Sequence, residues 1–274
     1  MNPIQSILVH LDAGQHGGAR LHVARTWGGR LGASVAALYA VTPASLGMAM
    51  VFAAGVPSPE LLAHDEARLA AARRLVDDAC IEPGVQIEWR EADDAPERAF
   101  VQQALYADLL VLGQHDGTRH DSGVAAGFVH AVIIESGKPA LVIPSGVDQA
   151  EATFGNVFVA WKESREAARA LTGALPLLQK ADSVCVAVEA GAGDAHRPRL
   201  QQFLQRHGVD DVQFRSVSSP APQAGDALLS MAADIGASLM VMGCYGHSRG
   251  REWILGGATR GVLQSMTLPV LMAH

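Results

Sequence analysis

The sequence predicts an α/β protein with two tandem doubly wound domains, each a parallel sheet covered on both faces by helices. Three observations favour this class. Strand-like and helix-like periodicities alternate along the chain, as crossover connections between parallel strands require. Several strand segments are continuous apolar runs, which is typical of strands buried on both faces. The pattern of the first half also recurs in the second half.

The internal repeat is carried by matching strand segments. Residues 108–113, DLLVLG, match 238–243, SLMVMG, and residues 137–143 match 267–273 without a gap. Each copy has five predicted strands, near residues 5–11, 33–41, 85–91, 108–113 and 140–144, and near 155–161, 183–189, 211–217, 238–243 and 269–273. We therefore predict one domain over residues 1–146 and a second over 152–274, joined by a short polar segment.

Helix boundaries are marked by capping residues. Ser58 followed by Pro59 predicts one helix start, and Ser164 before a run of leucines at helical spacing predicts another. We expect Asp94 to cap a third helix and Gly208 to end a helix that begins near Arg197. The last strand of each copy follows a proline and ends its domain, so we expect these two edges to pair and to form an intrachain pseudo-dimer.

Composition excludes several classes of protein. The 274 residues are 49% hydrophobic and 18% charged, which argues against a disordered chain. A net charge of −7 and an aromatic content of 5% argue against a nucleic-acid partner. The uncharged stretch 34–59 is interrupted by prolines and glycines, so no membrane span is expected.

The cysteines and the N-terminus point to a cytoplasmic protein. Cys80, Cys185 and Cys244 are odd in number and match no C-x-x-C spacing, which argues against a disulfide framework or a structural zinc site. The first ten residues contain no basic segment or cleavage pattern of a signal peptide. We therefore expect a reducing compartment.

The most informative segment is a glycine loop that follows the fourth strand of the second copy and opens a helix. Glycines allow backbone N–H groups to approach an anion, and a helix N-terminus favours negative charge. Cationic side chains, including Arg249, lie in the same segment. In open α/β sheets ligands bind at the carboxyl ends of strands where the winding direction reverses, which predicts a phosphate cradle here.

With these residues in view, the sequence resembles the tandem universal stress proteins over nearly its whole length. That family's nucleotide signature is G-x-x-G, nine residues, then G followed by Ser, Thr or Asn. The second copy matches it at Gly243, Gly246 and Gly256. The resemblance implies a sheet of strand order 3-2-1-4-5 in each copy and an adenine nucleotide ligand, ATP or AMP, with Mg²⁺ as a candidate companion. The nucleotide-binding residues expected in this way are Trp161, Lys162, Gly243, Gly246, His247, Arg249, Gly256, Gly257, Ala258 and Thr259.

The chain departs from the family pattern at several positions. Gly257 stands where a hydroxyl or amide residue is expected, and Lys162 stands where the family has an Asp near the adenosine. The first copy keeps that Asp as Asp12, but Asp116 replaces its second loop glycine. A carboxylate facing phosphate is repulsive, so we expect a nucleotide site in the second copy and a degenerate loop in the first.

Three hypotheses follow for the function. The first is a stress-response regulator or sensor that binds an adenine nucleotide and has no assigned catalytic residue. The second is an interaction module of the same fold without a nucleotide, for which the apolar loop around Met48 and Phe52 is one candidate partner surface. The third is a slow nucleotide or metabolite hydrolase in which Lys162 serves as the cation.

Other motifs favour structural roles. The polar run from His115 to Asp121 contains metal-ligand residue types, but a solvated loop is the simpler interpretation. Cys244 lies in the glycine loop near cations that would lower the pKa of a thiol, yet a small packing residue is the favoured interpretation. No site for a metal is predicted. Protein partners and any further oligomerisation stay undetermined by the sequence.

Overall fold

The structure, a computed structural model, describes residues 4–12, 14, 16–46, 58–81, 83–115, 123–145, 154–218, 223–246 and 257–274, with the side chains of 192–195 excepted. The chain forms two compact units. Unit 1 comprises Met1–Lys138 with Val147–Ala150, and unit 2 comprises Pro139–Gly146 with Glu151–His274.

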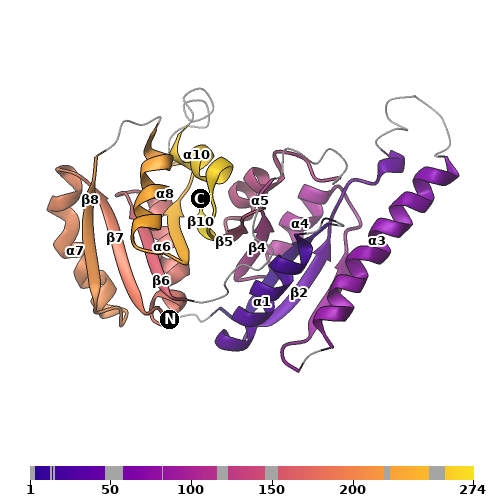
Figure 1. Ribbon diagram of the computed structural model, residues 1–274, viewed down its shortest axis with the longest axis horizontal. Coiled ribbons are helices and arrows are strands. Elements are labelled where there is room, and N and C mark those ends of the chain that lie inside the picture. Colours follow the sequence, from indigo (N-terminus) through magenta and orange to yellow (C-terminus); the bar gives the residue numbers. More distant parts are fainter. Residues whose placement is uncertain are drawn as a thin grey trace. The chain divides into compact units, whose positions relative to one another are not determined.

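Unit 1 alternates strands and helices, as its periodicity predicts (Figure 1). Its elements are β1 (Ser6–Leu11), α1 (Gly17–Leu31), β2 (Ser34–Tyr39), α3 (Pro59–Ala79), β3 (Ile87–Glu91), α4 (Pro96–Ala104), β4 (Leu109–Gly113) and α5 (Phe128–Ser136). The strands pair in parallel in the order β3-β2-β1-β4, with Ile7 opposite Val35 on one side and Leu109 on the other. The winding direction therefore reverses between β1 and β4.

Unit 2 repeats this order. Its elements are β5 (Ala140–Ile143), β6 (Asn156–Trp161), α6 (Arg165–Leu178), β7 (Ser183–Glu189), α7 (Ala192–Arg206), β8 (Val212–Val217), α8 (Ala224–Asp234), β9 (Leu239–Gly243), α10 (Ala258–Ser265) and β10 (Val270–Ala273). The parallel order β8-β7-β6-β9-β10 is the predicted 3-2-1-4-5 arrangement of the second copy. The reversal lies between β6 and β9.

The strand β5 extends the sheet of unit 2. It pairs antiparallel with β10, so that Leu141 lies opposite Leu271 and Val142 opposite Val270. The prediction that the two final strands of the copies pair is therefore confirmed. In sequence, β5 is the last strand of the first repeat copy, but its contacts place it in compact unit 2. The boundary between the compact units therefore differs from the boundary between the repeat copies.

The central strands form the core of each unit. The first four residues of β4 and of β9 are all buried, as continuous apolar runs predict for parallel strands covered on both faces. In unit 1, α1 packs beside α3 and α4 beside α5, while in unit 2 α8 packs beside α10. None of the helices in the described part of the chain is long and apolar enough to cross a bilayer.

Local predictions hold for the strands and for most helix ends. All ten predicted strands are present, with ends that differ by two residues at most from the predicted ones. Ser58 caps α3 and Ser164 caps α6, each by accepting a hydrogen bond from a backbone N–H. Gly208 follows α7 with a φ of +72°, although that helix begins at Ala192 rather than near Arg197.

The prediction that Asp94 caps a helix is wrong. Pro96 is the first residue of α4, so Ala95 takes the N-cap position and makes no side-chain cap. Asp94 instead accepts one hydrogen bond from the Ala95 N–H at 2.7 Å and pairs with Arg98 at 3.1 Å. The apolar loop around Met48 and Phe52 lies outside the described residues.

Candidate functional site

The carboxyl edge of unit 2 is built by β6, β9 and the segments that follow them. Ala160 of β6 pairs with Met242 of β9, so both strands end side by side at Trp161 and Gly243. The crossovers leave these two strands in opposite directions, which is the arrangement at which ligands bind in open α/β sheets. The structure thus places the start of the glycine loop where ligands bind in this class of sheet.

The first turn of α6 lies at this edge, directly after the end of β6. Ser164 has an extended backbone, with φ −147° and ψ 159°, and its Oγ accepts a hydrogen bond from the Ala167 N–H at 3.2 Å. This cap fixes the point at which the chain turns from β6 into the helix. The remaining N–H groups and the helix dipole give the edge a positive partial charge.

Gly243 is required by packing at this position. A Cβ on Gly243 would lie 2.3 Å from the Ala167 backbone nitrogen and 2.6 Å from the Glu166 carbonyl carbon. Neither backbone atom can move without displacing α6, so any larger residue would separate the helix from the end of β9. The first glycine of the loop therefore has a structural reason that is independent of any ligand.

Thr259 links the start of the loop to α10 by a hydrogen bond. The Tyr245 backbone N–H donates a hydrogen bond to the buried Thr259 Oγ1 at 3.4 Å, and Tyr245 has a φ of +56°, rare for a residue other than glycine. One residue earlier, the Cys244 N–H donates to the Ala273 carbonyl of β10 at 3.0 Å. Cys244 is buried, in agreement with its interpretation as a packing residue.

A buried carboxylate lies beneath the second glycine of the loop. The side chain of Glu166 is 4% exposed and accepts a hydrogen bond from Arg165 Nε through Oε1. Its Oε2 lies 3.0 Å from the position that a Cβ on Gly246 would take. Burial raises the pKa of Glu166, but hydrogen bonds from Arg165, from its own backbone N–H and from Ser164, together with the Arg165 charge, hold that pKa below its usual range.

The structure brings together part of the predicted set. Gly243 and Gly246 lie beside the first turn of α6, and Thr259 is hydrogen-bonded to the loop between them. Gly257 is the N-cap of α10 without a side-chain cap, and Ala258 is its first residue. Trp161 is half-buried at the end of β6 and Lys162 is exposed. His247, Arg249 and Gly256 lie outside the described residues.

Sequence reasoning missed Arg165 and Glu166. It recognised Ser164 as a cap, and the same spacing places the next two residues in the first turn of the helix, beside the loop. The direction of each side chain is not visible in that spacing, because Arg165 is 71% exposed whereas Glu166 is 4% exposed. Only the packing of α6 against β9 decides which of the two faces Gly246.

The equivalent edge of unit 1 is filled by an ion pair. Asp12 follows β1, accepts a hydrogen bond from the Gly14 N–H at 3.0 Å and pairs with buried Arg20 of α1 at 2.6 Å. A Cβ on Gly113, at the end of β4, would lie 2.1 Å from Arg20 Nη1. The guanidinium thus occupies the space above Gly113. Asp116, which replaces a loop glycine here, lies outside the described residues.

Charge at this edge of unit 1 is balanced internally. Burial raises the pKa of Asp12, but the Arg20 guanidinium, with smaller contributions from His10 and Gly14, holds it well below its usual range. Burial and the Arg20 charge lower the pKa of His10 to about 4, and its Nε2 lies 2.8 Å from the Ala40 carbonyl oxygen. A neutral His10 donates that hydrogen bond.

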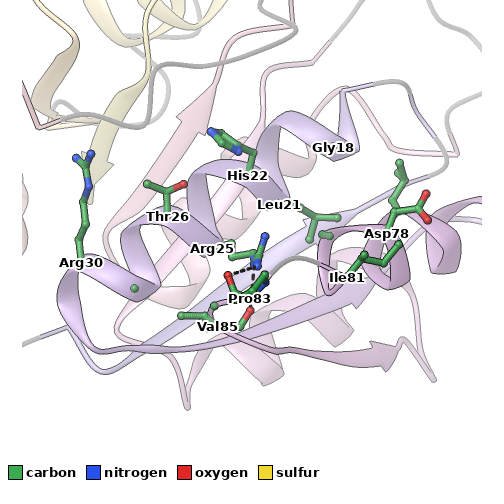
Figure 2. Close-up of a pocket in the computed structure, with 14 residues that line it drawn as sticks. Gly18, Leu21, His22, Arg25, Thr26, Arg30, Asp78, Ile81, Pro83 and Val85 are labelled. Atoms are coloured by element: carbon green, nitrogen blue, oxygen red, sulfur yellow. Dashed lines mark hydrogen bonds between the residues drawn. The ribbon is translucent and has the colours of Figure 1, made fainter.

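A surface groove of about 820 Å³ lies elsewhere on unit 1, between α1 and the connection from α3 to β3 (Figure 2). Arg25 crosses it and donates hydrogen bonds to the Pro83 carbonyl at 3.0 Å and the Val85 carbonyl at 3.3 Å. Its lining comprises Gly18, Leu21, His22, Arg25, Thr26, Gly29, Arg30, Leu75, Asp78, Ala79, Ile81, Pro83, Gly84 and Val85. The groove therefore contains no residue predicted to bind a nucleotide.

Metal-ligand residue types do not gather in the described part of the chain. No group of three or more His, Cys, Asp or Glu side chains there is placed to hold an ion. His115 follows β4 within the described residues, whereas 116–122 lie outside them.

Comparison with known proteins finds a family match for the last third of the chain. The model of the Universal stress protein family matches residues 189–274, which run from the end of β7 through β10 and include the glycine loop. Over residues 189–274 the chain is therefore similar to a universal stress protein domain.

Solved structures extend the fold to the whole chain. A universal stress protein from Archaeoglobus fulgidus superposes with a TM-score of 0.69 at 16% identity, over 98% of this chain and 95% of its own. A protein of unknown function from Pseudomonas aeruginosa gives a TM-score of 0.60 at 14% identity, over 98% and 92% of the two chains. No curated protein matches the sequence. The tandem fold of universal stress proteins thus spans both units.

Proposed function

We propose that the chain is a stress-response protein of the universal stress type whose second unit binds an adenine nucleotide and acts as a regulator or sensor. The observation that carries this proposal is the meeting of the capped α6 N-terminus with the Gly243–Gly246 turn at the strand reversal of unit 2. A helix N-terminus with closely approaching backbone suits a phosphate group. The match of residues 189–274 to the Universal stress protein family, whose resemblance implies an adenine nucleotide, supports adenosine as the rest of the ligand.

In this proposal each part of the edge has a separate task. Backbone N–H groups at Gly243, Gly246 and the start of α10 face the phosphate, while Trp161 and Lys162 line the adenosine side. His247, Arg249 and Gly256 complete the set proposed from the sequence. AMP and ATP, with or without Mg²⁺, are the ligands to test.

A second candidate is an interaction module that uses the same fold without a nucleotide. Two observations favour it: Gly243 is already explained by its packing against α6, and Thr259 is already engaged by Tyr245. In that case the signature residues are retained for the fold, and protein partners are the ligands to seek.

The two candidates are separated by analysis of the purified protein. Nucleotides released from untreated protein are identified and counted, and melting is followed with and without AMP or ATP, each with and without Mg²⁺. A ligand at about a hundred times its Kd stabilises the folded state by about 2.7 kcal/mol, which raises the melting temperature by several degrees.

The test uses one variant in each unit. Gly246→Val places a side chain against Glu166 and removes the close backbone approach, so the ligand-induced shift should disappear. Gly127→Val changes the residue before α5 in unit 1, where an added Cβ meets no atom within 4 Å, and should keep the shift. A protein that releases no nucleotide and shows no shift would support the interaction module instead.

A further inference from the structure

The carboxylate of Glu166 gives the proposed nucleotide site an uncommon charge. Its side chain is 4% exposed and comes from the first turn of α6, the helix N-terminus proposed above to face the phosphate. An acid in this position stabilises the helix through the dipole. It also places a fixed negative charge within the anion-binding edge itself.

The two oxygens of this carboxylate have different surroundings. Oε1 accepts the hydrogen bond from Arg165, whose side chain is 71% exposed and approaches from the solvent side. Oε2 is turned toward Gly246, 3.0 Å from the position of a virtual Cβ on that glycine, while the Ser164 Oγ is 3.8 Å from the same position. The negative charge therefore faces the backbone that a phosphate would contact.

Sign and distance decide what this charge does to a ligand. Each further phosphate adds negative charge, and repulsion between charges a few ångströms apart is strong where burial lowers the effective dielectric. A neutral nucleoside has no phosphate charge for the Glu166 carboxylate to repel. Arg165 offsets part of the Glu166 charge, but its exposed position allows solvent to screen it more than the buried carboxylate.

We propose that Glu166 sets the charge selectivity of this site, so that unit 2 prefers nucleosides with no phosphate or one phosphate over triphosphates. The inference rests on the proposed function, because it needs an adenine nucleotide at this edge. Arg165 acts as the opposing charge: it weakens the selectivity that Glu166 creates. Together the pair determines how many phosphates the glycine loop accepts.

The experiment measures the Kd of adenosine, AMP and ATP by calorimetry without added Mg²⁺, for the full chain and three variants. Glu166→Gln should lower the Kd of ATP by about tenfold, equivalent to about 1.4 kcal/mol. It should lower the Kd of AMP by a smaller factor and leave the Kd of adenosine unchanged. Glu163→Gln is the matched control, because Glu163 directly precedes the N-cap Ser164, is 60% exposed and pairs with His196. It should leave all three constants within about twofold, since exposed pairs contribute little.

Arg165→Gln keeps the proposal testable if Glu166→Gln does not fold. Its side chain lies largely in solvent, so the variant should fold, and ATP should weaken relative to adenosine because the carboxylate loses its counter-charge. An unchanged ratio of ATP to adenosine affinity in Glu166→Gln, or in Arg165→Gln where the former does not fold, overturns the inference and leaves the proposed function intact. Absence of binding by all three ligands to the unaltered protein overturns the proposed function and the inference with it.

Discussion

In unit 1, Arg20 Nη2 lies 2.6 Å from Asp12 Oδ1, and both side chains are largely withdrawn from solvent. Asp12 directly follows β1 and Arg20 is the fourth residue of α1, so the pair joins the strand end to the helix at the reversal of the sheet. The matching edge of unit 2 has Lys162 after the strand, and its buried carboxylate, Glu166, pairs with the exposed Arg165. The two copies thus use the same edge differently.

Removing one partner of this pair should destabilise the protein strongly. Asp12→Asn leaves the Arg20 guanidinium buried without its counter-charge, and such a loss costs about 3–5 kcal/mol. Urea unfolding measures the change. Asp77→Asn, which breaks the exposed pair with Arg73, should cost less than about 1 kcal/mol. Equal effects of the two variants would contradict a buried role for Asp12.

Acid should weaken unit 1 through His10. The pKa of His10 is lowered from 6.5 to about 4 in the folded state, so between these values the unfolded chain binds the extra proton. The free energy of unfolding is then highest above pH 6.5 and falls as the pH drops toward 4. Asp12, whose pKa is also lowered, adds a second loss below its ordinary value of 3.8.

This pH dependence is checked by urea unfolding at several pH values between 7 and 4. In His10→Asn the slope of unfolding free energy against pH over this window should flatten. His64→Asn alters an exposed histidine of α3 and should keep the slope of the unaltered protein. A slope that persists in His10→Asn would assign the pH dependence to other groups.

The close approach of Gly243 to α6 predicts a large effect for a single added methyl group. Gly243→Ala should destabilise unit 2 by about 1–3 kcal/mol, because the new Cβ meets backbone atoms that cannot turn away. Thermal unfolding measures it. Gly127→Ala, at an open position, is the control and should change stability by less than about 0.5 kcal/mol. Comparable stability of both variants would show that α6 moves away freely.

The serine caps of α6 and α3 allow the role of a helix N-terminus at the proposed site to be compared with that of a helix N-terminus away from it. Ser164→Ala and Ser58→Ala each remove a hydrogen bond to a backbone N–H and should each cost about 1 kcal/mol of stability. Only Ser164→Ala should also weaken nucleotide binding, because α6, unlike α3, lies at the proposed phosphate position. Calorimetry with AMP decides, and an equal loss of affinity in both variants would contradict this placement.

The fold could be predicted from the sequence because its signals are local and repeated. Continuous apolar runs such as 109–112 mark buried strands, and Ser58 and Ser164 mark helix starts by side-chain chemistry that needs no tertiary partner. The cap expected at Asp94 failed because the fixed φ of Pro96 moved the helix start forward by one residue.

The charges of the two sites could not be predicted in the same way. Whether Arg20 lies buried above Gly113, or Glu166 rather than Arg165 turns toward Gly246, depends on how a helix packs on a strand distant in sequence. Sequence spacing places these residues on the right turn of the right helix. It does not determine which of two neighbouring charged side chains is buried.

The antiparallel pairing of β5 with β10 has a consequence for synthesis of the chain. The strand β5 leaves the ribosome first, and its partner β10 is translated roughly 130 residues later, which at typical elongation rates takes on the order of 6–25 s. Throughout that interval one edge of β5 has no strand to bind. A nascent chain that stalls within the second half therefore presents an open strand edge to its neighbours on the same messenger RNA.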